Sequence, residues 1–324
     1  MKIKLDFTIV EFSYVAPIQV LKNQLIQNKA LRVSIKIDEQ YIGELALTPL
    51  PHFHHYTLEE WRFSLKEFFE EKEFDFYHID LEAPFFNTIK STFVFSGELL
   101  FAIESVLFLI IEKKYSKALA HIEKKPIHIN ALYSSKLPLK TTPNCLKIKI
   151  RPTPKSIADT ITIIKKSQRS HFRLDGNRSF DSLELKTFLL LLKKECGDIS
   201  SLIEYIEEPF KNSNDLFTFK SQFTLALDES LIQYVEQSKI FLFPNNFMAI
   251  IKPSLIGISK SFFLMEQLKE RAVISSTYES SSAMRPLMYL AAINPRLHHG
   301  LDTFKFLPKE LCNHTLNDQF CLLF

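Results

Sequence analysis

Short apolar runs separated by helix-length segments dominate the chain from about residue 126 onward. Runs of this kind are typical of strand–helix units that build a parallel sheet. They are PIHINALY (126 to 133), CLKIKI (145 to 150), HFRLD (171 to 175), LIEYIEE (202 to 208), TLALDES (224 to 230), MAIIKP (248 to 253) and AVISST (272 to 277), with LDTFKF (301 to 306) as a candidate eighth. Seven or eight such units predict an α/β fold of the TIM-barrel type.

The N-terminal part has a different pattern, with short alternating segments followed by helical periodicity. Apolar residues recur at intervals of three and four in residues 57 to 72 and 97 to 120, which predicts two helices in a small α+β domain. The run LLFAIESVLFLII is too short for a membrane span and contains Glu104, so we expect a buried helix there. We place the domains at residues 1–122 (α+β), 123–306 (barrel) and 307–324 (a C-terminal segment that packs back on the first domain).

Composition narrows the classes of function. The chain has 324 residues, 46% of them hydrophobic, which is enough for a large core, and its net charge of +3 gives no reason to expect a nucleic-acid partner. Six glycines leave no glycine-rich phosphate cradle, which excludes the classical Rossmann and P-loop folds. The N-terminal stretch alternates charged and apolar residues, unlike a signal peptide. The cysteines lack C-x-x-C spacing and indicate reduced thiols in a cytoplasmic protein rather than a disulfide frame or a zinc knot; they are Cys145, Cys196, Cys312 and Cys321.

Charged residues stand at or near the C-terminal ends of five apolar runs. They are Lys147, Lys149, Asp175, Glu207, Asp228 and Lys252. Successive residues of a strand point to opposite faces, and each of these runs keeps apolar residues for the face that packs on the outer helices. Because barrel enzymes build their active sites at the C-terminal ends of the strands, we expect these side chains to meet at the barrel mouth.

The sequence YIEEPF, which begins at Tyr205, holds two adjacent carboxylates that a strand must direct to opposite faces. Alternation places Glu207 on the face of Ile203 and Tyr205, and Glu208 on the face of Glu204. Apolar layers topped by one carboxylate suit a barrel interior better than a face that carries Glu204 deep inside. We therefore predict that Glu207 points into the mouth and that Glu208 makes contacts at the rim.

Three carboxylates, Asp175, Glu207 and Asp228, follow one another on successive strands. At one point of the rim they repel one another unless a cation neutralises them, and an all-oxygen site suits Mg²⁺ or Mn²⁺. Any one of them alone could instead cap a helix or pair with an arginine. Their common phase favours a metal site.

Lysines flank this expected metal site on two sides. Lys147 and Lys149 are two residues apart and both point inward, and neighbouring positive charges lower the pKa of one of them toward that of a general base. Lys252 enters from four strands further round, on the opposite wall. A metal between opposed lysines suits removal of a proton from a carbon next to a carboxylate, so we expect a small-molecule carboxylate as the partner.

The order of these motifs resembles the enolase superfamily in its muconate-lactonising branch. The motifs are K-x-K (147 to 149), D-x-N (175 to 177), E-E-P (207 to 209), D-E-S (228 to 230) and K-P (252 to 253). Within that branch, GELALTPLPHF (43 to 53), RLDGNR (173 to 178), VISSTYESS (273 to 281) and GLDT (300 to 303) resemble segments of the o-succinylbenzoate synthase family. The resemblance implies a modified (β/α)7β TIM barrel with an N-terminal α+β capping domain.

By this resemblance, Lys149 would remove the α-proton and then assist departure of a hydroxyl, while Lys252 would stabilise the enediolate. Asp175, Glu207 and Asp228 would bind Mg²⁺, and the residues that line the substrate would be Lys147, Asn177, Ser275 and Gly300. The implied reaction is dehydration of 2-succinyl-6-hydroxy-2,4-cyclohexadiene-1-carboxylate to 2-succinylbenzoate in menaquinone biosynthesis. Arg151, His52 and Tyr278 depart from the family pattern and bear on substrate fit.

Two rival hypotheses stay open. An N-acylamino-acid racemase or dipeptide epimerase of the same branch would use the same two lysines, and a non-catalytic barrel would be a binding module. Retention of all the buried charges in phase argues against the binding module. The sequence does not determine an oligomeric state. His52, His54 and His55 lie in a loop that we expect over the barrel mouth rather than in a transition-metal site.

Overall fold

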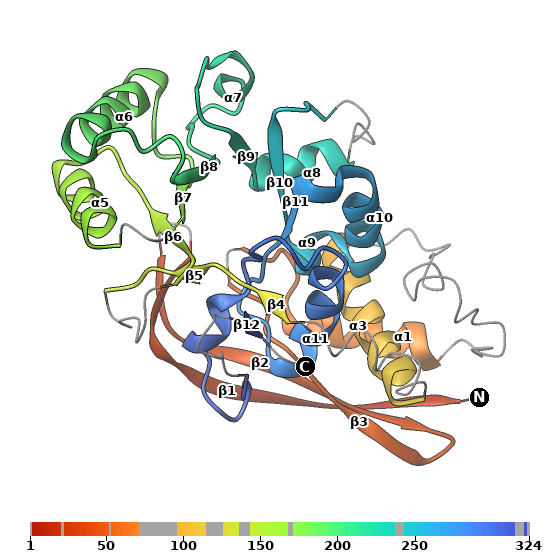
Figure 1. The fold of residues 1–324 in the computed structure, drawn as a ribbon. Coiled ribbons are helices and arrows are strands. Elements are labelled where there is room, and N and C mark those ends of the chain that lie inside the picture. The colour runs from red at the N-terminus through yellow and green to blue at the C-terminus, as the bar shows by residue number, and fades with distance from the viewer. Residues whose placement is uncertain are drawn as a thin grey trace.

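The computed structural model describes residues 2–20, 23–51, 53–70, 96–114, 126–135, 143–167, 171–236, 243–314 and 321–322. An N-terminal antiparallel sheet with its helices lies against a curled parallel sheet whose helices cover the outer side (Figure 1). This architecture confirms the predicted capping domain and modified TIM barrel. The domain boundaries stay a prediction, because the chain around residue 122 lies outside the described ranges.

The N-terminal sheet is a three-stranded meander of β1 (Ile3–Val20), β2 (Asn23–Ile37) and β3 (Gln40–Leu47). Alternate residues at both ends of β1 are buried, which is the pattern of a sheet with one face on a core. Helices α1 (Leu58–Glu70) and α3 (Gly97–Lys114) pack against this sheet. They lie within the two stretches predicted to be helical, whose last residues fall outside the described ranges.

Helix α3 joins the capping domain to the barrel. A Cβ atom at Gly97 would lie 2.0 Å from the carbonyl oxygen of Leu255, so this close approach requires glycine. Further along α3, the buried carboxylate of Glu104 accepts hydrogen bonds from the backbone N–H groups of Ile258 and Ser259. These groups begin a barrel helix and have no acceptor within it. The predicted buried helix is confirmed, and none of the described helices is long and apolar enough to cross a membrane.

The parallel sheet has the strand order β11, β10, β9, β8, β7, β6, β5. Its strands are β5 (Ala131–Leu132), β6 (Cys145–Lys149), β7 (His171–Asp175), β8 (Ile203–Glu207), β9 (Leu225–Leu227), β10 (Phe247–Ile251) and β11 (Ala272–Ile274). Each of the seven predicted runs contains one of these strands. Two further short strands, β4 (Ile127–His128) and β12 (Cys321–Leu322), pair with each other, so this part of the C-terminal segment pairs with the start of the barrel.

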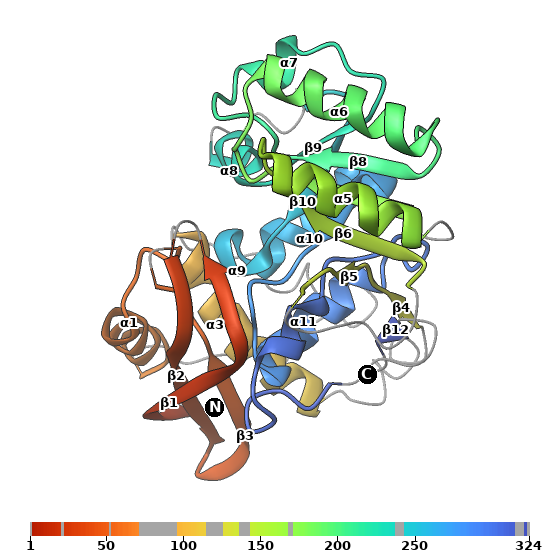
Figure 2. The same cartoon turned by 90° about the vertical axis from the view of Figure 1, so that its left-hand side faces the viewer.

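Helices of the barrel follow its strands in sequence and lie on the outside of the sheet (Figure 2). They are α5 (Pro154–Lys166), α6 (Ser182–Cys196), α7 (Asp215–Thr218), α8 (Glu229–Glu236), α9 (Pro253–Ile256), α10 (Ile258–Leu268) and α11 (Ser281–Ala291), with 3₁₀ turns at Lys269–Arg271 and Asp302–Phe306. Local signals start α5 and α6: Thr153 caps α5 with Pro154 in its first turn, and Asp181 and Glu184 form a capping box on α6.

The barrel closes differently from the predicted eighth strand. LDTFKF was expected to be a strand, but Asp302–Phe306 is a 3₁₀ helix. Closure is made just before it, where His299 bridges to Ile129 and Gly300 bridges to Ser275, both in parallel sense. These two bridging residues close the ring of strands between the ends of the parallel sheet, and the chain then turns away from the barrel.

A β-bulge in β8 corrects the predicted alternation. Phe172 pairs with Ile203, but the next residue of β7, Arg173, pairs with Tyr205. Glu204 is therefore the extra residue, and its carboxylate lies 2.7 Å from the Nε atom of the buried Arg173. Tyr205 and Glu207 do share the inner face, but Ile203 packs in the outer core and Glu204 reaches the interior.

Candidate active site

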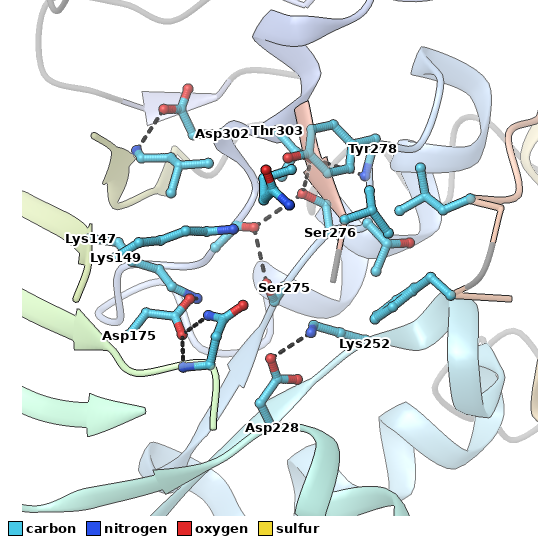
Figure 3. A pocket seen from close by; sticks show the side chains of 18 of the residues that line it. Lys147, Lys149, Asp175, Asp228, Lys252, Ser275, Ser276, Tyr278, Asp302 and Thr303 are labelled. Atoms are coloured by element: carbon cyan, nitrogen blue, oxygen red, sulfur yellow. Dashed lines mark hydrogen bonds and ion pairs between the residues drawn. The ribbon is translucent and has the colours of Figure 1, made fainter. Parts of the chain in front are cut away.

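A pocket lies at the C-terminal ends of the barrel strands, under the loops of the capping domain. Side chains from β6, β7 and the segments after β9, β10 and β11 line it, together with Leu50 and Phe53 of the capping domain. Figure 3 shows Lys147 and Lys149 entering from one side and Lys252 from the other. The predicted convergence at the barrel mouth is confirmed.

The three predicted metal ligands are buried and adjacent. Asp175 and Glu207 end neighbouring strands and face each other in register, and Asp228 directly follows β9. Their side chains are between 1% and 10% exposed. Burial raises the pKa of Asp228 to about 7, because a carboxylate out of water is costly unless a cation neutralises it.

Lys147 lies among these carboxylates. Its Nζ atom is 2.6 Å from Oε1 of Glu207 and 3.0 Å from Oδ2 of Asp175. Burial would lower the pKa of Lys147, but the carboxylates outweigh it and raise this pKa well above its ordinary value. The other oxygen of Glu207, Oε2, is buried with no hydrogen-bond partner among the described residues. Three buried carboxylates with an unpaired oxygen are a donor set that fits Mg²⁺ or Mn²⁺.

Lys149 differs from Lys147, although the two side chains share a face of β6. In the described part of the chain, no carboxylate forms an ion pair with Lys149, and solvent reaches its side chain through the pocket. The surrounding protein, with the charges of Lys147, Arg151 and Lys252, lowers its pKa despite the presence of Asp175. The shift has the direction predicted from neighbouring positive charge, but its largest cause is the protein that surrounds Lys149, and the charge of Lys147 is a smaller cause. Lys149 is therefore the lysine of the pocket that can lose its proton.

Lys252 is a cation fixed by its surroundings. Its Nζ atom lies 2.5 Å from Oδ2 of Asp228 and 5.2 Å from the ring centre of Phe53. Burial would lower its pKa, but Asp228 and Glu229 raise it. The strand that precedes Lys252, β10, is separated from β6 by three strands, so Lys149 and Lys252 reach the pocket from opposite walls (Figure 3).

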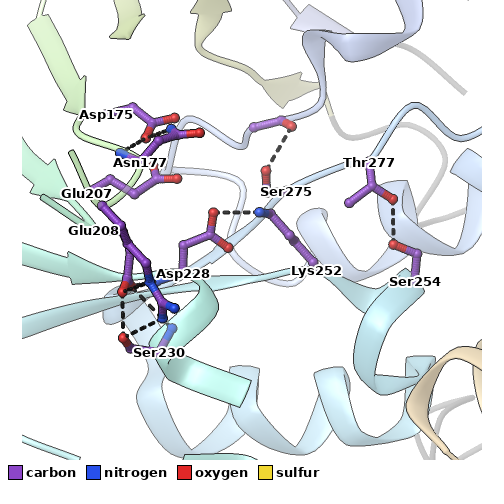
Figure 4. Close-up of polar contacts among 12 residues, drawn as sticks. Asp175, Asn177, Glu207, Glu208, Asp228, Ser230, Lys252, Ser254, Ser275 and Thr277 are labelled. Atoms are coloured by element: carbon purple, nitrogen blue, oxygen red, sulfur yellow. Dashed lines mark hydrogen bonds and ion pairs between the residues drawn. The ribbon is translucent and has the colours of Figure 1, made fainter. Parts of the chain in front are cut away.

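The four residues predicted to line the substrate also lie at the pocket. Asn177 donates its side-chain and backbone N–H groups to Asp175 and so orients that carboxylate (Figure 4). Ser275 and Gly300 bridge to each other, and a Cβ atom at Gly300 would lie 2.8 Å from Oγ of Ser275. A side chain at this position would therefore require Ser275 to shift.

Glu208 points away from the metal ligands, as the alternation predicted. Its carboxylate accepts hydrogen bonds from Nε of Arg178 at 2.9 Å, the backbone N–H of Asp228 at 3.0 Å and the backbone N–H of Ser230 at 3.2 Å. It is 1% exposed, so it is buried beneath the rim rather than at the surface. Figure 4 shows its carboxylate directed toward Ser230. Glu208 positions the backbone that carries Asp228.

The histidine-containing loop contributes to the roof of the pocket, as expected. His54 is buried, its Nδ1 atom accepts a hydrogen bond from the backbone N–H of Leu50 at 2.9 Å, and burial lowers its pKa to about 4. His55 pairs with Glu98 at 2.8 Å, and His52 lies outside the described residues. These contacts hold the loop so that Leu50 and Phe53 face the pocket.

Sequence reasoning missed several polar residues of the pocket. Glu229 lines it with Oε2 unpaired among the described residues, and burial raises its pKa to about 7. Asp302 lies at the opposite end, where Lys305 lies 2.5 Å away and the backbone N–H of Leu132 donates at 2.8 Å. The D-E-S motif next to Asp228 was a signal in the sequence for Glu229. The Asp302–Lys305 pair had no such signal, because it forms only through the unexpected 3₁₀ turn.

Curated sequences and solved structures place this geometry among known proteins. No family model matches the chain. Over 204 residues it is 27% identical to Protein PHYLLO, chloroplastic, of Arabidopsis thaliana, which spans 53% of the chain and 12% of that protein. Over 151 residues it is 28% identical to an o-succinylbenzoate synthase of Aliivibrio fischeri, which spans 43% of the chain and 44% of the synthase. The sequence similarity therefore covers less than half the length of these relatives.

Solved structures match over nearly the whole chain. The o-succinylbenzoate synthase of Thermosynechococcus elongatus, complexed with Mg in the active site, aligns with a TM-score of 0.64, 18% identity and 94% of each chain. The dipeptide epimerase of Methylococcus capsulatus, complexed with Mg and a dipeptide, aligns with a TM-score of 0.68, 15% identity and 100% and 97% of the two chains. The muconate lactonizing enzyme of Pseudomonas putida aligns with a TM-score of 0.71, 14% identity and 99% and 93%. The chain thus has the capping domain and modified TIM barrel of the enolase superfamily, and its sequence is similar to the o-succinylbenzoate synthases.

Proposed function

We propose that the chain is a Mg²⁺-dependent o-succinylbenzoate synthase. It would dehydrate 2-succinyl-6-hydroxy-2,4-cyclohexadiene-1-carboxylate to 2-succinylbenzoate in menaquinone biosynthesis. One observation carries the proposal: a lysine that can lose its proton and a lysine fixed as a cation face each other across three buried carboxylates. Sequence similarity to o-succinylbenzoate synthases supports the choice of reaction.

Asp175, Glu207 and Asp228 would hold the metal. Lys147 offers one positive charge to two of these carboxylates, and Oε2 of Glu207 is unpaired among the described residues, so the set can accept a divalent ion. When bound, Mg²⁺ neutralises the carboxylates and withdraws electron density from the substrate carboxylate, which acidifies the α-carbon. Asn177 keeps Asp175 in position for this role.

Lys149 would act first as base and then as acid. Its neutral amine takes the α-proton, and the electron pair of the broken C–H bond moves toward the substrate carboxylate to form an enediolate. The resulting ammonium group donates a proton to the leaving hydroxyl, the C–O bond breaks, and water departs as the ring becomes aromatic. Lys252, held by Asp228 and Phe53, contributes positive charge on the other face of the enediolate.

Dipeptide epimerisation or N-acylamino-acid racemisation is the second candidate, since epimerases share the fold over the whole chain. One observation weighs against both reactions, and a second weighs against dipeptide epimerisation alone. Exchange of a proton between two faces needs a second base, whereas Lys252 is held as a cation by Asp228. A dipeptide also brings an ammonium group, and Asp302 at the end of the pocket is already paired with Lys305.

The test is direct comparison of the three reactions on purified protein. Formation of 2-succinylbenzoate is followed by chromatography with Mg²⁺ and after its removal by a chelator, and dipeptide epimerisation and N-acylamino-acid racemisation are followed by polarimetry. We expect Mg²⁺-dependent dehydration and no faster turnover of the chiral substrates. Dipeptides or N-acylamino acids that turn over with the higher kcat/KM would transfer the assignment to the epimerase or racemase. Binding without turnover of any substrate would leave a binding module.

A further inference from the structure

A second group of ligand-type side chains lies at the opposite end of the barrel from the active site. Cys145 is the first residue of β6, Glu204 is the bulged residue of β8, and His298 precedes the two residues that close the barrel. These three positions are far apart in sequence, which is why the cysteine spacing alone gave no sign of them.

The three side chains approach one another closely. Sγ of Cys145 lies 3.8 Å from Oε2 of Glu204, and Nδ1 of His298 lies 3.8 Å from Oε1 of Glu204. One ligand atom from each residue lies within 4.8 Å of the other two. Ligands of a tetrahedral Zn²⁺ ion, bound at about 2.0 to 2.3 Å, are separated by somewhat less, so small side-chain movements complete the geometry.

The surroundings suit a metal that prefers sulfur and nitrogen. Arg173 donates from Nε to Oε2 of Glu204 at 2.7 Å, an outer contact of the kind that orients a metal-ligating carboxylate. Nδ1 of His298 faces Glu204, and a neutral imidazole offers a ring-nitrogen lone pair to a metal. Cys145 is buried, but Glu204 and His298 are partly exposed and give access from solvent.

We propose that Cys145, Glu204 and His298 form a second metal site, for Zn²⁺ or a similar thiolate-binding transition metal. Binding displaces the thiol proton of Cys145 to solvent. The thiolate and the carboxylate of Glu204 then neutralise the two positive charges of Zn²⁺, and the site is left with the single positive charge of Arg173. A fourth position stays open for water. Because His298 adjoins the closing residues His299 and Gly300, the metal would fix the end of the ring to β6 and β8, at the face of barrels that serves stability.

Zinc binding by the full-length chain tests the proposal. The protein is stripped with a chelator, saturated with Mg²⁺ so that the three-carboxylate site is filled, and titrated with Zn²⁺ by calorimetry. We expect one Zn²⁺ per chain, a higher melting temperature, and affinity at least about 100-fold weaker in Cys145→Ala, since even outer-contact changes cost 10- to 100-fold. Cys312→Ala removes another buried cysteine, which is not one of the three ligands, and should bind like the unchanged protein.

Cobalt provides a readout that does not depend on the variants. Co²⁺ bound to the unchanged protein should show the near-ultraviolet charge-transfer band of a thiolate ligand, and Zn²⁺ should abolish this band. Absence of the band, lack of Zn²⁺ binding in the presence of Mg²⁺, or equal Zn²⁺ affinity in Cys145→Ala would each overturn the proposal. None of these outcomes bears on the dehydration assay, so the two proposals fail separately.

Discussion

Replacement of Gly300 by alanine tests whether the closure of the barrel also shapes the active site. The added Cβ atom would lie 2.8 Å from Oγ and 3.2 Å from Cβ of Ser275, and contacts below 3.0 Å are essentially never observed for real Cβ atoms. Overpacking of this kind costs about 1–3 kcal/mol. If the strain also displaces Ser275 in the transition state, kcat/KM falls by about 5- to 150-fold, at 1.36 kcal/mol per factor of ten.

The assay is a double-mutant cycle measured by 2-succinylbenzoate formation and by urea unfolding. Adding Ser275→Ala to Gly300→Ala removes the nearer contact and should recover part of the lost stability, and adding Ser275→Gly removes both contacts and should recover more of that stability. Gly43→Ala serves as control, because its Cβ atom would meet the side chain of Leu109 alone, in the capping domain. Normal stability and turnover of Gly300→Ala, or no recovery in the double variants, would refute the reasoning.

The remaining predictions concern the charged residues. Glu207→Gln should abolish Mg²⁺-dependent turnover with a small change in the melting temperature, whereas Glu208→Gln should lower stability yet keep measurable turnover; the reverse pattern in a paired assay would mean that the inner face is misassigned. Lys149→Ala should lose both dehydration and deuterium exchange at the α-carbon of a bound non-eliminating analogue. In the unchanged enzyme, kcat/KM should rise with pH as Lys149 deprotonates, at a pH below the ordinary lysine range. Lys252→Arg should recover part of the activity that Lys252→Ala loses, because arginine keeps the charge but is a poor base. If Lys252→Arg is as inactive as Lys252→Ala, Lys252 transfers a proton. Burial raises the pKa of Glu104 from 4.5 to about 7, so its folded state holds the proton more tightly and stability should decline by up to about 3 kcal/mol between pH 4.5 and 7. Glu104→Gln should flatten this part of a stability–pH curve measured by urea unfolding, and an unchanged slope would contradict the burial argument.

Alternation along the strands was enough to predict the inner face of the active site. Lys149, Asp175, Asp228 and Lys252 lie where a period of two places them, because each strand is short, regular at its C-terminal end and apolar on its outer side. The same rule failed at Glu204. A bulge depends on how two strands pair, which a single strand's pattern does not contain.

Long-range pairing also explains the other differences. LDTFKF has the composition of a strand. His299 and Gly300 already bridge to the strands on either side, so the next residues are not needed for strand pairing and form a 3₁₀ turn. That turn brings Lys305 onto Asp302, a contact that no local periodicity encodes. Cys145, Glu204 and His298 likewise lie close together only because the strands pair into a closed barrel.

The junction at Gly97 and Glu104 has a consequence for how substrates enter. A hinge that swung the capping domain away from the barrel would pull the start of α3 off Leu255 and leave the first N–H groups of α10 without their acceptor. The two domains are therefore expected to move as one body during turnover. Opening and closing of the pocket then falls to short segments of its roof, such as the loop that carries Leu50 and Phe53, so exchange of ligands should depend on local rearrangement within a rigid frame.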